Sequence, residues 1–531
     1  MALRDSEYRI LEDIVGTENI TSEPAILDTY NQVWGNKALF DQKFSQRPAA
    51  VLLPGSTEEV QAVVTACNEH RIAFKPFSSG FEFVSLTLAN ERGILLDLKR
   101  MDRVLEIDAE NMCAVVEPYV GIYRLQKELA RHGLTIGAVG CGPNANVIAA
   151  SCCHFGGGLT AVSTGGLGRS VLGVEWVLPT GEIVRLGAPG TGVGWFTGDG
   201  PGPSLRGVLR GRSGANGGHG VITKAAVKCY PWYGGEWKFQ GQPGTVTSAK
   251  RVPVPANYEN FVLTFPSPDD LWEAMARVGR AEIAACVMGA FLFPQEEGND
   301  EQWAEIQKLQ QIGFNWAEVS TRSVAIVLGS ETARGMEYRK NCLMHICREM
   351  GGASIPLAPE QASALFAGGV FHFGFLTEAI RRTGDFFVNP THDATVDMVK
   401  IARKSTIELI QPYMDKGLVQ QTGAVDLYAT ATEHNSIGCH VENITFYDPW
   451  DPDSLQALRE IAERGEDPHG SLGAFGVPQL GGGLQIEFVN HLHQKWGPVY
   501  DNYDASLRKI KQALDPNNVG DWSAYVPPIF P

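Results

Sequence analysis

The sequence predicts an α+β protein of two or three domains. Its 531 residues are too many for a single hydrophobic core. Patterns typical of strands and helices alternate, with short connections, over residues 49–133. A second alternation follows residues 234–255, which have the Gly, Pro, Lys and Thr content of a linker. Short alternating elements of both kinds favour a mixed fold over an all-helical one.

The first elements are read from their periodicity and from the residues that begin or end them. Residues 7–15 form a helix whose apolar residues share one face. A strand over 49–53 is bracketed by prolines, and a helix over 56–67 follows, with Thr57 as its N-cap and acidic residues in its first turn. The other elements of this region are strands at 72–75, 93–98 and 113–117 and a helix at 122–132, which ends at Gly133.

Glycine becomes dense between residues 137 and 235. Dense glycine marks positions where the backbone approaches something closely or adopts a positive φ. Apolar strands at 173–178, 183–186 and 221–230 interleave with these glycines, which argues against disorder. After the linker, a second α+β domain is predicted from strands and helices at 261–264, 268–278, 323–328 and 336–350, and a last helix covers 495–514.

Charge, termini and cysteines exclude several classes of protein. The net charge is −16, and an acidic surface repels phosphate backbones, so a nucleic-acid partner is not expected. The first twelve residues lack the apolar run of a signal peptide, and no run of about 18 apolar residues predicts a membrane span. The ten cysteines contain no Cys-x-x-Cys pair, so zinc-ribbon and iron–sulfur spacings are absent. Buried, reduced thiols in a cytoplasmic protein are the expectation.

Three loops of small residues follow strands in the first half of the chain. They are residues 76–80 (PFSSG), 144–158 (NANVIAASCCHFGGG) and 211–223 (GRSGANGGHGVIT). Each loop offers backbone N–H groups with little side-chain bulk, which suits a pyrophosphate. Three such loops in order indicate one large dinucleotide cofactor. None has the Gly-x-Gly-x-x-Gly of a Rossmann NAD site or the Gly-Lys-Ser/Thr of a P-loop, so neither of those sites is supported.

Several segments, in a characteristic order, carry a resemblance to a known family. They are residues 48–60 (PAAVLLPGSTEEV), 72–80, 96–98 (LDL) with 101–104 (MDRV), 116–118 (VEP), 172–182, 220–224 (GVITK) and 510–517 (IKQALDPN). On these segments the chain resembles the FAD-binding superfamily of vanillyl-alcohol oxidase, para-cresol methylhydroxylase and the flavin subunit of glycolate oxidase. The segments are spread over nearly the whole chain.

The resemblance implies an α+β fold with a split FAD-binding domain of PCMH type. Two α+β subdomains would lie within residues 1–236, an α+β cap domain over the flavin would comprise 237–494, and residues 495–531 would return to the FAD-binding domain. By motif position, the resemblance assigns these residues to FAD: Pro76, Ser78, Ser79, Gly80, Phe81, Asn146, Ile148, Ala149, Ser151, His154, Gly157, Gly217, Gly220 and Ile222.

Two departures from the family pattern bear on chemistry. Relatives with flavin bound covalently at the first loop carry His there, whereas Phe81 and Glu82 follow Gly80 here, so non-covalent FAD is expected. The histidines of the other loops, His154 and His219, either face the flavin or make structural hydrogen bonds. Phenol-oxidising members carry a Tyr-Arg pair late in the cap, and residues 476–481 (GVPQLG) lack it, which argues against phenol oxidation.

The cap segment 433–443 (EHNSIGCHVEN) is the candidate catalytic strand. Hydroxy-acid members carry a His-rich metal or base motif here that ends in His-x-Asn, and His440 matches that ending while the central Asp-Gly-Asn is missing. His440 and Glu442 alternate, so on a strand they would share a face, where they can bind a metal or act as a base. His434 is a second candidate base, and no metal is assigned. A strand edge with solvated polar residues is the open alternative.

Arg381 follows the aromatic run 371–375 (FHFGF), so it is a candidate clamp for a substrate carboxylate. An ordinary helix surface is the alternative. These features predict an enzyme that oxidises a small hydroxy acid or alcohol by hydride transfer to FAD. The alternatives are a 4-alkylphenol oxidase and a non-catalytic flavin subunit that relays electrons. The expected electron acceptor is oxygen or a separate iron–sulfur, cytochrome or flavoprotein partner, and a homodimer is compatible with the sequence.

Overall fold

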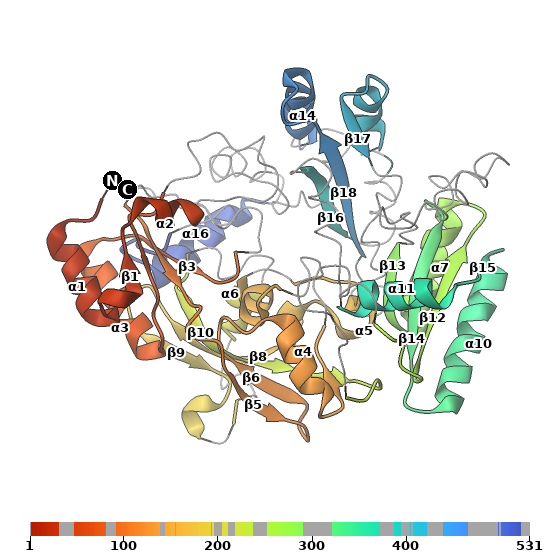
Figure 1. Ribbon diagram of the computed structural model, residues 1–531, viewed down its shortest axis with the longest axis horizontal. Coiled ribbons are helices and arrows are strands. Elements are labelled where there is room, and N and C mark those ends of the chain that lie inside the picture. The colour runs from red at the N-terminus through yellow and green to blue at the C-terminus, as the bar shows by residue number, and fades with distance from the viewer. Residues whose placement is uncertain are drawn as a thin grey trace. The chain divides into compact units, whose positions relative to one another are not determined.

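The computed structural model describes residues 2–30, 47–80, 92–137, 144–153, 156–192, 194–195, 204–210, 218–236, 252–289, 321–371, 387–394, 404, 407–421, 439–465, 498 and 501–521. The chain forms two compact units (Figure 1). Unit 1 comprises Met1–Gly156, Gly166–Trp232 and Leu480–Pro531, and unit 2 comprises Gly157–Gly165 and Tyr233–Gln479. No helix within the described ranges is long and apolar enough to span a bilayer.

The first subdomain of unit 1 is built around a four-stranded sheet. Its elements are α1 (Asp5–Val15), η1 (Thr17–Asn19), β1 (Ile20–Thr21), α2 (Pro24–Thr29), β2 (Ala50–Leu52), α3 (Thr57–His70), β3 (Phe74–Phe77) and β4 (Ile94–Asp97). The strand order is β1-β2-β4-β3, in which β2, β4 and β3 are parallel and β1 is antiparallel. Helices α1 and α3 lie side by side (Figure 1) and share an apolar core with the sheet.

The ends of α3 decide where β3 begins. Ser56 is the N-cap of α3, because its hydroxyl accepts a hydrogen bond from the Glu59 amide at 3.2 Å. The prediction that Thr57 caps this helix was therefore wrong. At the other end, Arg71 adopts a left-handed conformation and the Ile72 amide donates to the Cys67 carbonyl at 2.9 Å. This cap occupies Ile72, so β3 starts at Phe74 and runs two residues beyond the predicted strand.

The second subdomain of unit 1 is built around a five-stranded antiparallel sheet of order β5-β6-β10-β8-β9. Its strands are β5 (Val104–Asp108), β6 (Cys113–Val116), β8 (Val171–Val177), β9 (Ile183–Leu186) and β10 (Val221–Lys228), and the short strands β7 (Leu134–Thr135) and β11 (Tyr230–Pro231) pair separately. Its helices are α4 (Ile122–Ala130), η3 (Ala149–Cys153), η4 (Leu167–Ser170), η5 (Pro189–Thr191) and α6 (Arg206–Arg210). An apolar core that includes the buried Trp176 lies against this sheet.

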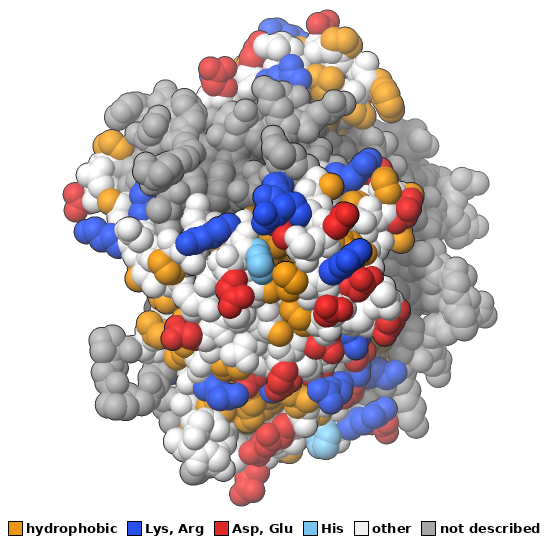
Figure 2. Space-filling model, turned by 90° about the vertical axis from the view of Figure 1, so that its left-hand side faces the viewer, with side chains coloured by type: hydrophobic (Ala, Val, Ile, Leu, Met, Phe, Trp, Pro, Cys, Tyr) orange, Lys and Arg blue, Asp and Glu red, His pale blue; other side chains and the backbone are white. Residues whose placement is uncertain are grey.

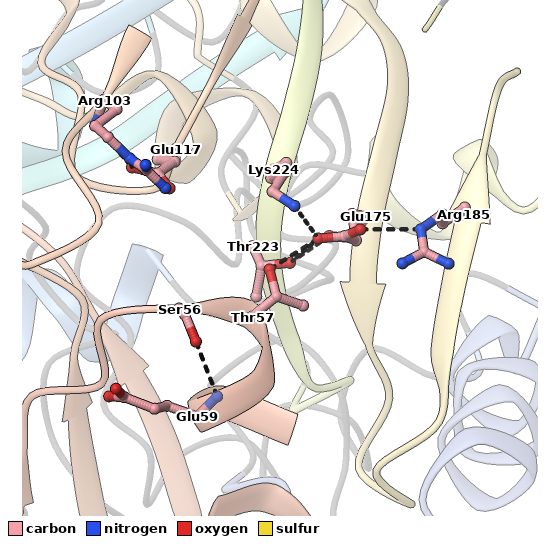
Figure 3. A network of polar contacts seen from close by, with 9 residues as sticks. All are labelled: Ser56, Thr57, Glu59, Arg103, Glu117, Glu175, Arg185, Thr223 and Lys224. Atoms are coloured by element: carbon pink, nitrogen blue, oxygen red, sulfur yellow. Dashed lines mark hydrogen bonds and ion pairs between the residues drawn. The ribbon is translucent and has the colours of Figure 1, made fainter. Parts of the chain in front are cut away.

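Glu175 links the two subdomains (Figure 3). It lies on β8 and accepts hydrogen bonds from Thr57 of α3 at 2.8 Å and from Arg185 of β9 at 2.9 Å. Lys224 of β10 lies 2.8 Å from the same carboxylate. Burial raises the pKa of Glu175, but the hydrogen bonds from Lys224, Thr57 and Arg185 outweigh burial and leave the pKa below its usual value. The helix of one subdomain is thus fixed to the sheet of the other through one buried carboxylate.

Unit 2 contains two antiparallel sheets in its described part. The first has the order β13-β14-β12-β15 and the second the order β16-β18-β17. Its elements are α5 (Ala161–Thr164), β12 (Tyr258–Thr264), α7 (Pro268–Ala281), β13 (Ala284–Gly289), β14 (Ser323–Gly329), α10 (Ala333–Glu349), β15 (Ala353–Ile355), α11 (Pro359–Phe371), β16 (Phe387–Ala394), β17 (Val419–Gln421), β18 (Cys439–Tyr447) and α14 (Pro452–Gly465). Helices α7 and α10 share a core with the first sheet.

The segment 157–165 belongs to unit 2 although it lies within the sequence of unit 1. The Val287 amide of β13 donates to the Leu159 carbonyl at 3.1 Å, and the Ser163 hydroxyl donates to the Ala285 carbonyl at 2.9 Å. Val162 is buried in the core of the first sheet of unit 2. Figure 2 shows that acidic and basic side chains are interspersed over the described part of one face of the molecule.

Candidate functional site

The first of the three predicted loops leaves β3 directly. The Phe74 amide donates to the Val519 carbonyl at 2.9 Å, and β4 pairs with the other edge of β3, so the strand that carries the loop is held on both edges. Residues 76–80 are half-buried. Gly80 has a φ of +68°, the left-handed region in which a Cβ is strained, so glycine is required at this turn.

A buried side chain joins the first loop to the second. The Ser79 amide donates to Oδ1 of Asn146 at 2.8 Å, and Nδ2 of Asn146 donates to the Tyr119 carbonyl at 2.7 Å. Asn146 is itself held because its flanking amides and carbonyls pair with the chain around Val120 and Ile122. Two predicted FAD residues, Ser79 and Asn146, are thus brought together by a direct contact.

The other predicted residues of the second loop differ in what they offer a ligand. Ile148 is buried in the core of the second subdomain, as is Ile222 of the third loop, so these two residues have only their backbones to offer. Ala149 and Ser151 lie in the one-turn π-helix η3. The Ser151 hydroxyl is fully buried and has no hydrogen-bond partner. Gly157 begins the segment of unit 2 described above.

The third loop is described from Gly218 onward. Gly218 and Gly220 have φ values of +73° and +104°. A Cβ at Gly220 would collide with the carbonyl of Val177, and one at Gly218 would lie 2.6 Å from the carbonyl of Gly520. These glycines are therefore required by contacts within the protein. Such contacts, as well as the approach of a cofactor, account for the many glycines in this region.

The third loop is also held by the C-terminal helix α16 (Tyr503–Leu514). Nζ of Lys511 donates to the Gly218 carbonyl at 2.7 Å, to Oδ2 of Asp515 at 2.6 Å and to the Gly520 carbonyl at 2.8 Å. Lys511 and Asp515 are fully buried. Burial lowers the pKa of Lys511, and Asp515 acts in the opposite direction. In the sequence Lys511 and Asp515 are four residues apart at the end of a predicted helix, but nothing local relates them to Gly218, so this pair was not predicted.

A cluster of Tyr30, Asp97 and Lys99 contacts Phe77, the residue at which the first loop leaves β3. The Tyr30 ring meets the Phe77 ring edge-on, with 5.1 Å between centroids. The Tyr30 hydroxyl donates to Oδ2 of Asp97 at 2.7 Å, and Nζ of Lys99 lies 3.0 Å from the same oxygen. Burial raises the pKa of Tyr30, and Asp97 raises it further. No sequence motif connects Tyr30 to the strand that carries Asp97, so this cluster was not predictable from spacing.

The first two loops carry polar groups that could bind the pyrophosphate of FAD. Within the described ranges, the amides of Ser78 and Gly80 make no hydrogen bond, whereas the Ser79 amide is used by Asn146. The buried Ser151 hydroxyl of the second loop also has no hydrogen-bond partner among the described residues. Two backbone N–H groups at a turn with a left-handed glycine suit a pyrophosphate, which accepts hydrogen bonds from backbone amides. The residues present therefore fit FAD.

In unit 2, two of the four predicted catalytic residues lie on a described strand. His440 and Glu442 belong to β18, which pairs with β16 in an antiparallel register that sets His440 opposite Asp393 and Glu442 opposite Thr391. Residues directly opposite in an antiparallel pair share a face, as do alternate residues of one strand. These four positions therefore occupy one face of the sheet, and His392, opposite Val441, is on the other.

Other predicted site residues lie outside the described part of the chain. They are Phe81, His154, Gly217, Arg381 and His434. In the part that is described, no group of three or more His, Cys, Asp or Glu side chains is arranged to hold a metal ion. The described cysteines are free thiols, as expected; burial raises the pKa of Cys153 to about 12, so this thiol stays neutral at physiological pH.

Comparison with known proteins supports the same cofactor. Residues 48–187 match the FAD binding domain family FAD_binding_4. Glycolate oxidase subunit GlcD of Bacillus subtilis is 31% identical over 189 residues, which cover 36% of this chain and 38% of GlcD. A mitochondrial D-lactate dehydrogenase [cytochrome] of Arabidopsis thaliana is 32% identical over 138 residues, 26% of this chain and 24% of that protein. The chain thus spans well under half the length of these relatives.

Comparison with solved structures covers nearly the whole chain. The crystal structure of p-cresol methylhydroxylase with substrate bound superposes with a TM-score of 0.72 and covers 98% of this chain and 96% of that one, at 18% identity. Similarity at this level of identity shows a shared fold. The predicted α+β fold of PCMH type and the predicted FAD cofactor are confirmed. The chain therefore has the PCMH-type fold and an FAD binding domain over residues 48–187, and its cofactor is FAD.

Proposed function

We propose that this protein oxidises a small hydroxy acid or alcohol, with His440 as the base that takes the hydroxyl proton of the substrate. When bound, FAD supplies the hydride acceptor. The observation that carries the proposal is the register of β18 on β16, which sets His440 opposite Asp393. A histidine is suited to the role because its ordinary pKa lies close to the working pH of an enzyme.

Asp393 strengthens the case for His440 as a base. Directly opposed residues in an antiparallel pair have Cβ atoms about 4.5–5.5 Å apart, so the register sets an acidic residue next to the proposed base. In this proposal Glu442 and Thr391 form the rest of the same polar face.

The substrate class rests on two supports. The names of the two relatives, a glycolate oxidase subunit and a D-lactate dehydrogenase, refer to 2-hydroxy acids, although the alignments cover about a third of this chain or less. The sequence also offers Arg381 as a clamp for a carboxylate, a role for which a planar guanidinium is suited. We propose that electrons then pass to oxygen or to a separate redox protein of the cytoplasm.

The test is an anaerobic flavin-bleaching screen with 2-hydroxy acids, alditols and 4-alkylphenols. We expect bleaching by a 2-hydroxy acid or an alditol, and a rate at least about 100-fold lower in His440→Ala, since a positioned general base contributes at least this much. His392→Ala is the matched control, because His392 lies on the neighbouring strand and on the other face of the sheet. It should bleach at the wild-type rate.

Three results would contradict the proposal in different ways. Bleaching by 4-alkylphenols alone would assign the protein to phenol oxidation, a reaction that the fold shared with p-cresol methylhydroxylase allows. A flavin that no substrate class bleaches, but that exchanges electrons with a redox partner, would indicate a relay. Equal loss of rate in His440→Ala and His392→Ala would show that the sheet, rather than one imidazole, is required.

A further inference from the structure

The chain from Lys511 to Asp521 contacts β3, the strand that carries the first predicted FAD loop, and also the third predicted loop. Gly520 forms a parallel bridge to Phe74, three residues before the first loop leaves β3 at Phe77, and the Asp521 amide donates to the Phe74 carbonyl at 2.8 Å. On the same segment, the Gly520 carbonyl and the Gly218 carbonyl of the third loop accept hydrogen bonds from one ammonium group, that of Lys511. The segment is thus placed between two loops that are distant in sequence.

All three N–H donors of the Lys511 ammonium group are used in hydrogen bonds within the protein. An ammonium group has three N–H donors, and here they go to the Gly218 carbonyl, the Gly520 carbonyl and Asp515. The side chain has no exposed surface. A buried lysine near a cofactor is often a nucleophile or a base, but one with all three donors engaged inside the protein serves to hold its partners.

Asp515 completes the arrangement on the other side. Its Oδ1 accepts from the Val519 amide at 3.0 Å and its Oδ2 from the Gly520 amide at 2.8 Å, in addition to Lys511. A second buried ion pair lies beside it, between Lys75 of β3 and Asp521 at 3.3 Å. The chain that follows α16 is therefore fixed at Val519 and Gly520 by Asp515 and at its far end by β3.

Gly218 and Gly520 are packed so closely that neither position has room for a side chain. A Cβ on Gly520 would collide with the Gly218 carbonyl, and a Cβ on Gly218 would come within 2.8 Å of Nζ of Lys511. The two backbones therefore touch, and the Lys511 ammonium binds both carbonyls at the point of contact. Movement of the third loop away from β3 would break the bond between Lys511 and Gly218.

We infer that Lys511 and Asp515 are positioning residues for FAD, which set the third loop at a fixed distance from the first. The inference goes beyond the proposed oxidation, since it concerns affinity for the cofactor and not turnover. It predicts that loss of the pair weakens FAD binding more than it weakens the fold. A purely structural role predicts the reverse.

The test uses Lys511→Met/Asp515→Asn in the full chain. The double variant removes both charges, because a single substitution would leave one buried charge unpaired and would unfold the segment. The asparagine introduced by Asp515→Asn keeps an acceptor for the Val519 or Gly520 amide. Apoprotein from riboflavin-limited cells is titrated with FAD, and thermal unfolding is followed with and without FAD. We expect a Kd for FAD raised at least about tenfold, with the far-ultraviolet circular dichroism of the apoprotein unchanged.

Glu7→Gln is the matched control. Glu7 is a buried carboxylate of the same unit, but its partners Arg4 and Arg92 lie away from the three loops in sequence and contact. It should lower the unfolding temperature of apoprotein and holoprotein equally, with FAD affinity unchanged. An unchanged Kd in the Lys511/Asp515 variant, together with a lower unfolding temperature, would overturn the inference.

Hydrogen exchange in the wild-type protein decides the matter if the variant does not fold. FAD should slow exchange of the Val519 and Gly520 amides, which are bound to Asp515, and of amides at residues 218–222. It should not slow the amides of α1. Equal exchange of residues 519–520 with and without FAD would contradict the inference, because it would mean that the C-terminal segment does not respond to occupancy of the site.

Discussion

The amide of Ser79 donates a hydrogen bond to the side-chain oxygen of Asn146 at 2.8 Å, so a single buried side chain joins the first two of the predicted FAD loops. The same side chain is tied to the Tyr119 carbonyl through its amide nitrogen. Both ends of the amide are used within the protein. Asn146 therefore fixes the Ser79 amide of the first loop, and we propose that the amides of Ser78 and Gly80 bind the cofactor.

Asn146→Ala is expected to lower FAD affinity by about tenfold. The substitution leaves the Ser79 amide and the Tyr119 carbonyl without their partner, so the first loop gains freedom that binding must remove, and the two lost hydrogen bonds together make a loss of about 1.4 kcal/mol, or tenfold in Kd, the expected size. The measurement is the Kd for FAD by quenching of flavin fluorescence on addition of apoprotein.

The control for this prediction is Asn19→Ala. The Asn19 side chain donates to the Val15 carbonyl at 2.8 Å, in the same unit but in contact with none of the loops. It should reduce the free energy of unfolding without a change in Kd. If both variants changed FAD affinity to the same extent, Asn146 would have no special role.

Gly80→Val is expected to abolish retention of FAD through purification. A β-branched residue is strongly disfavoured at a φ of +68°, and its side chain would also block the approach of the phosphates to the backbone. Gly133→Val is the matched control, because Gly133 also has a φ of +68° and a Cβ there would meet no atom closer than 4.0 Å. Flavin content per chain, read from the absorption spectrum, separates backbone strain, which both variants share, from loss of the site. A fully loaded Gly80 variant would remove this loop from the cofactor site.

Glu175→Gln is expected to lower the free energy of unfolding by about 2 kcal/mol at pH 7. The substitution breaks a buried set of charged hydrogen bonds, and the figure is set below the usual cost of breaking a buried pair because Arg185 and Lys224 are partly exposed. The pKa of Glu175 is below its usual value in the folded protein. Its stabilising effect is therefore present above the usual carboxyl pKa and is lost as the pH falls through the lowered one.

Denaturant unfolding at several pH values tests this account. The difference between wild type and Glu175→Gln should be constant from pH 7 to about pH 5 and should shrink below that. Arg124→Ala is the control, since its ion pair with Asp102 is exposed on both sides and should contribute less than about 1 kcal/mol. A wild-type advantage that grows as the pH falls would contradict the sign of the pKa shift.

Local signals predicted the elements of the fold and the places of the loops. Strands such as β4 are buried apolar runs, and Gly80 was recognisable because a turn after a strand with positive φ requires glycine. The glycines of the third loop were less informative. Gly218 and Gly220 are required by the carbonyls of Gly520 and Val177, so contact within the protein and contact with a cofactor produce the same composition.

Contacts between distant segments could not be predicted. Ser79 and Asn146 are 67 residues apart, and Lys511 and Gly218 are 293 apart, so no periodicity or spacing relates them. The prediction that Thr57 is an N-cap was wrong for the same reason, a contact with a distant residue. Its hydroxyl suited an N-cap, but the carboxylate of Glu175, 118 residues away, is its partner, and Ser56 caps the helix instead.

The hydrogen bonds from Lys511 to Gly218 and Gly520 have a consequence for the order of events during synthesis of the protein. A ribosome releases β3 and the third loop early, and then synthesises all of unit 2 before it reaches residue 511. Until Asp521 has left the exit tunnel, β3 lacks its partner at Gly520, and the Gly218 carbonyl lacks its ammonium. We therefore expect the chain to bind FAD more weakly until the C-terminal segment has been translated, so a nascent chain arrested before residue 511 should hold less flavin than the full-length protein.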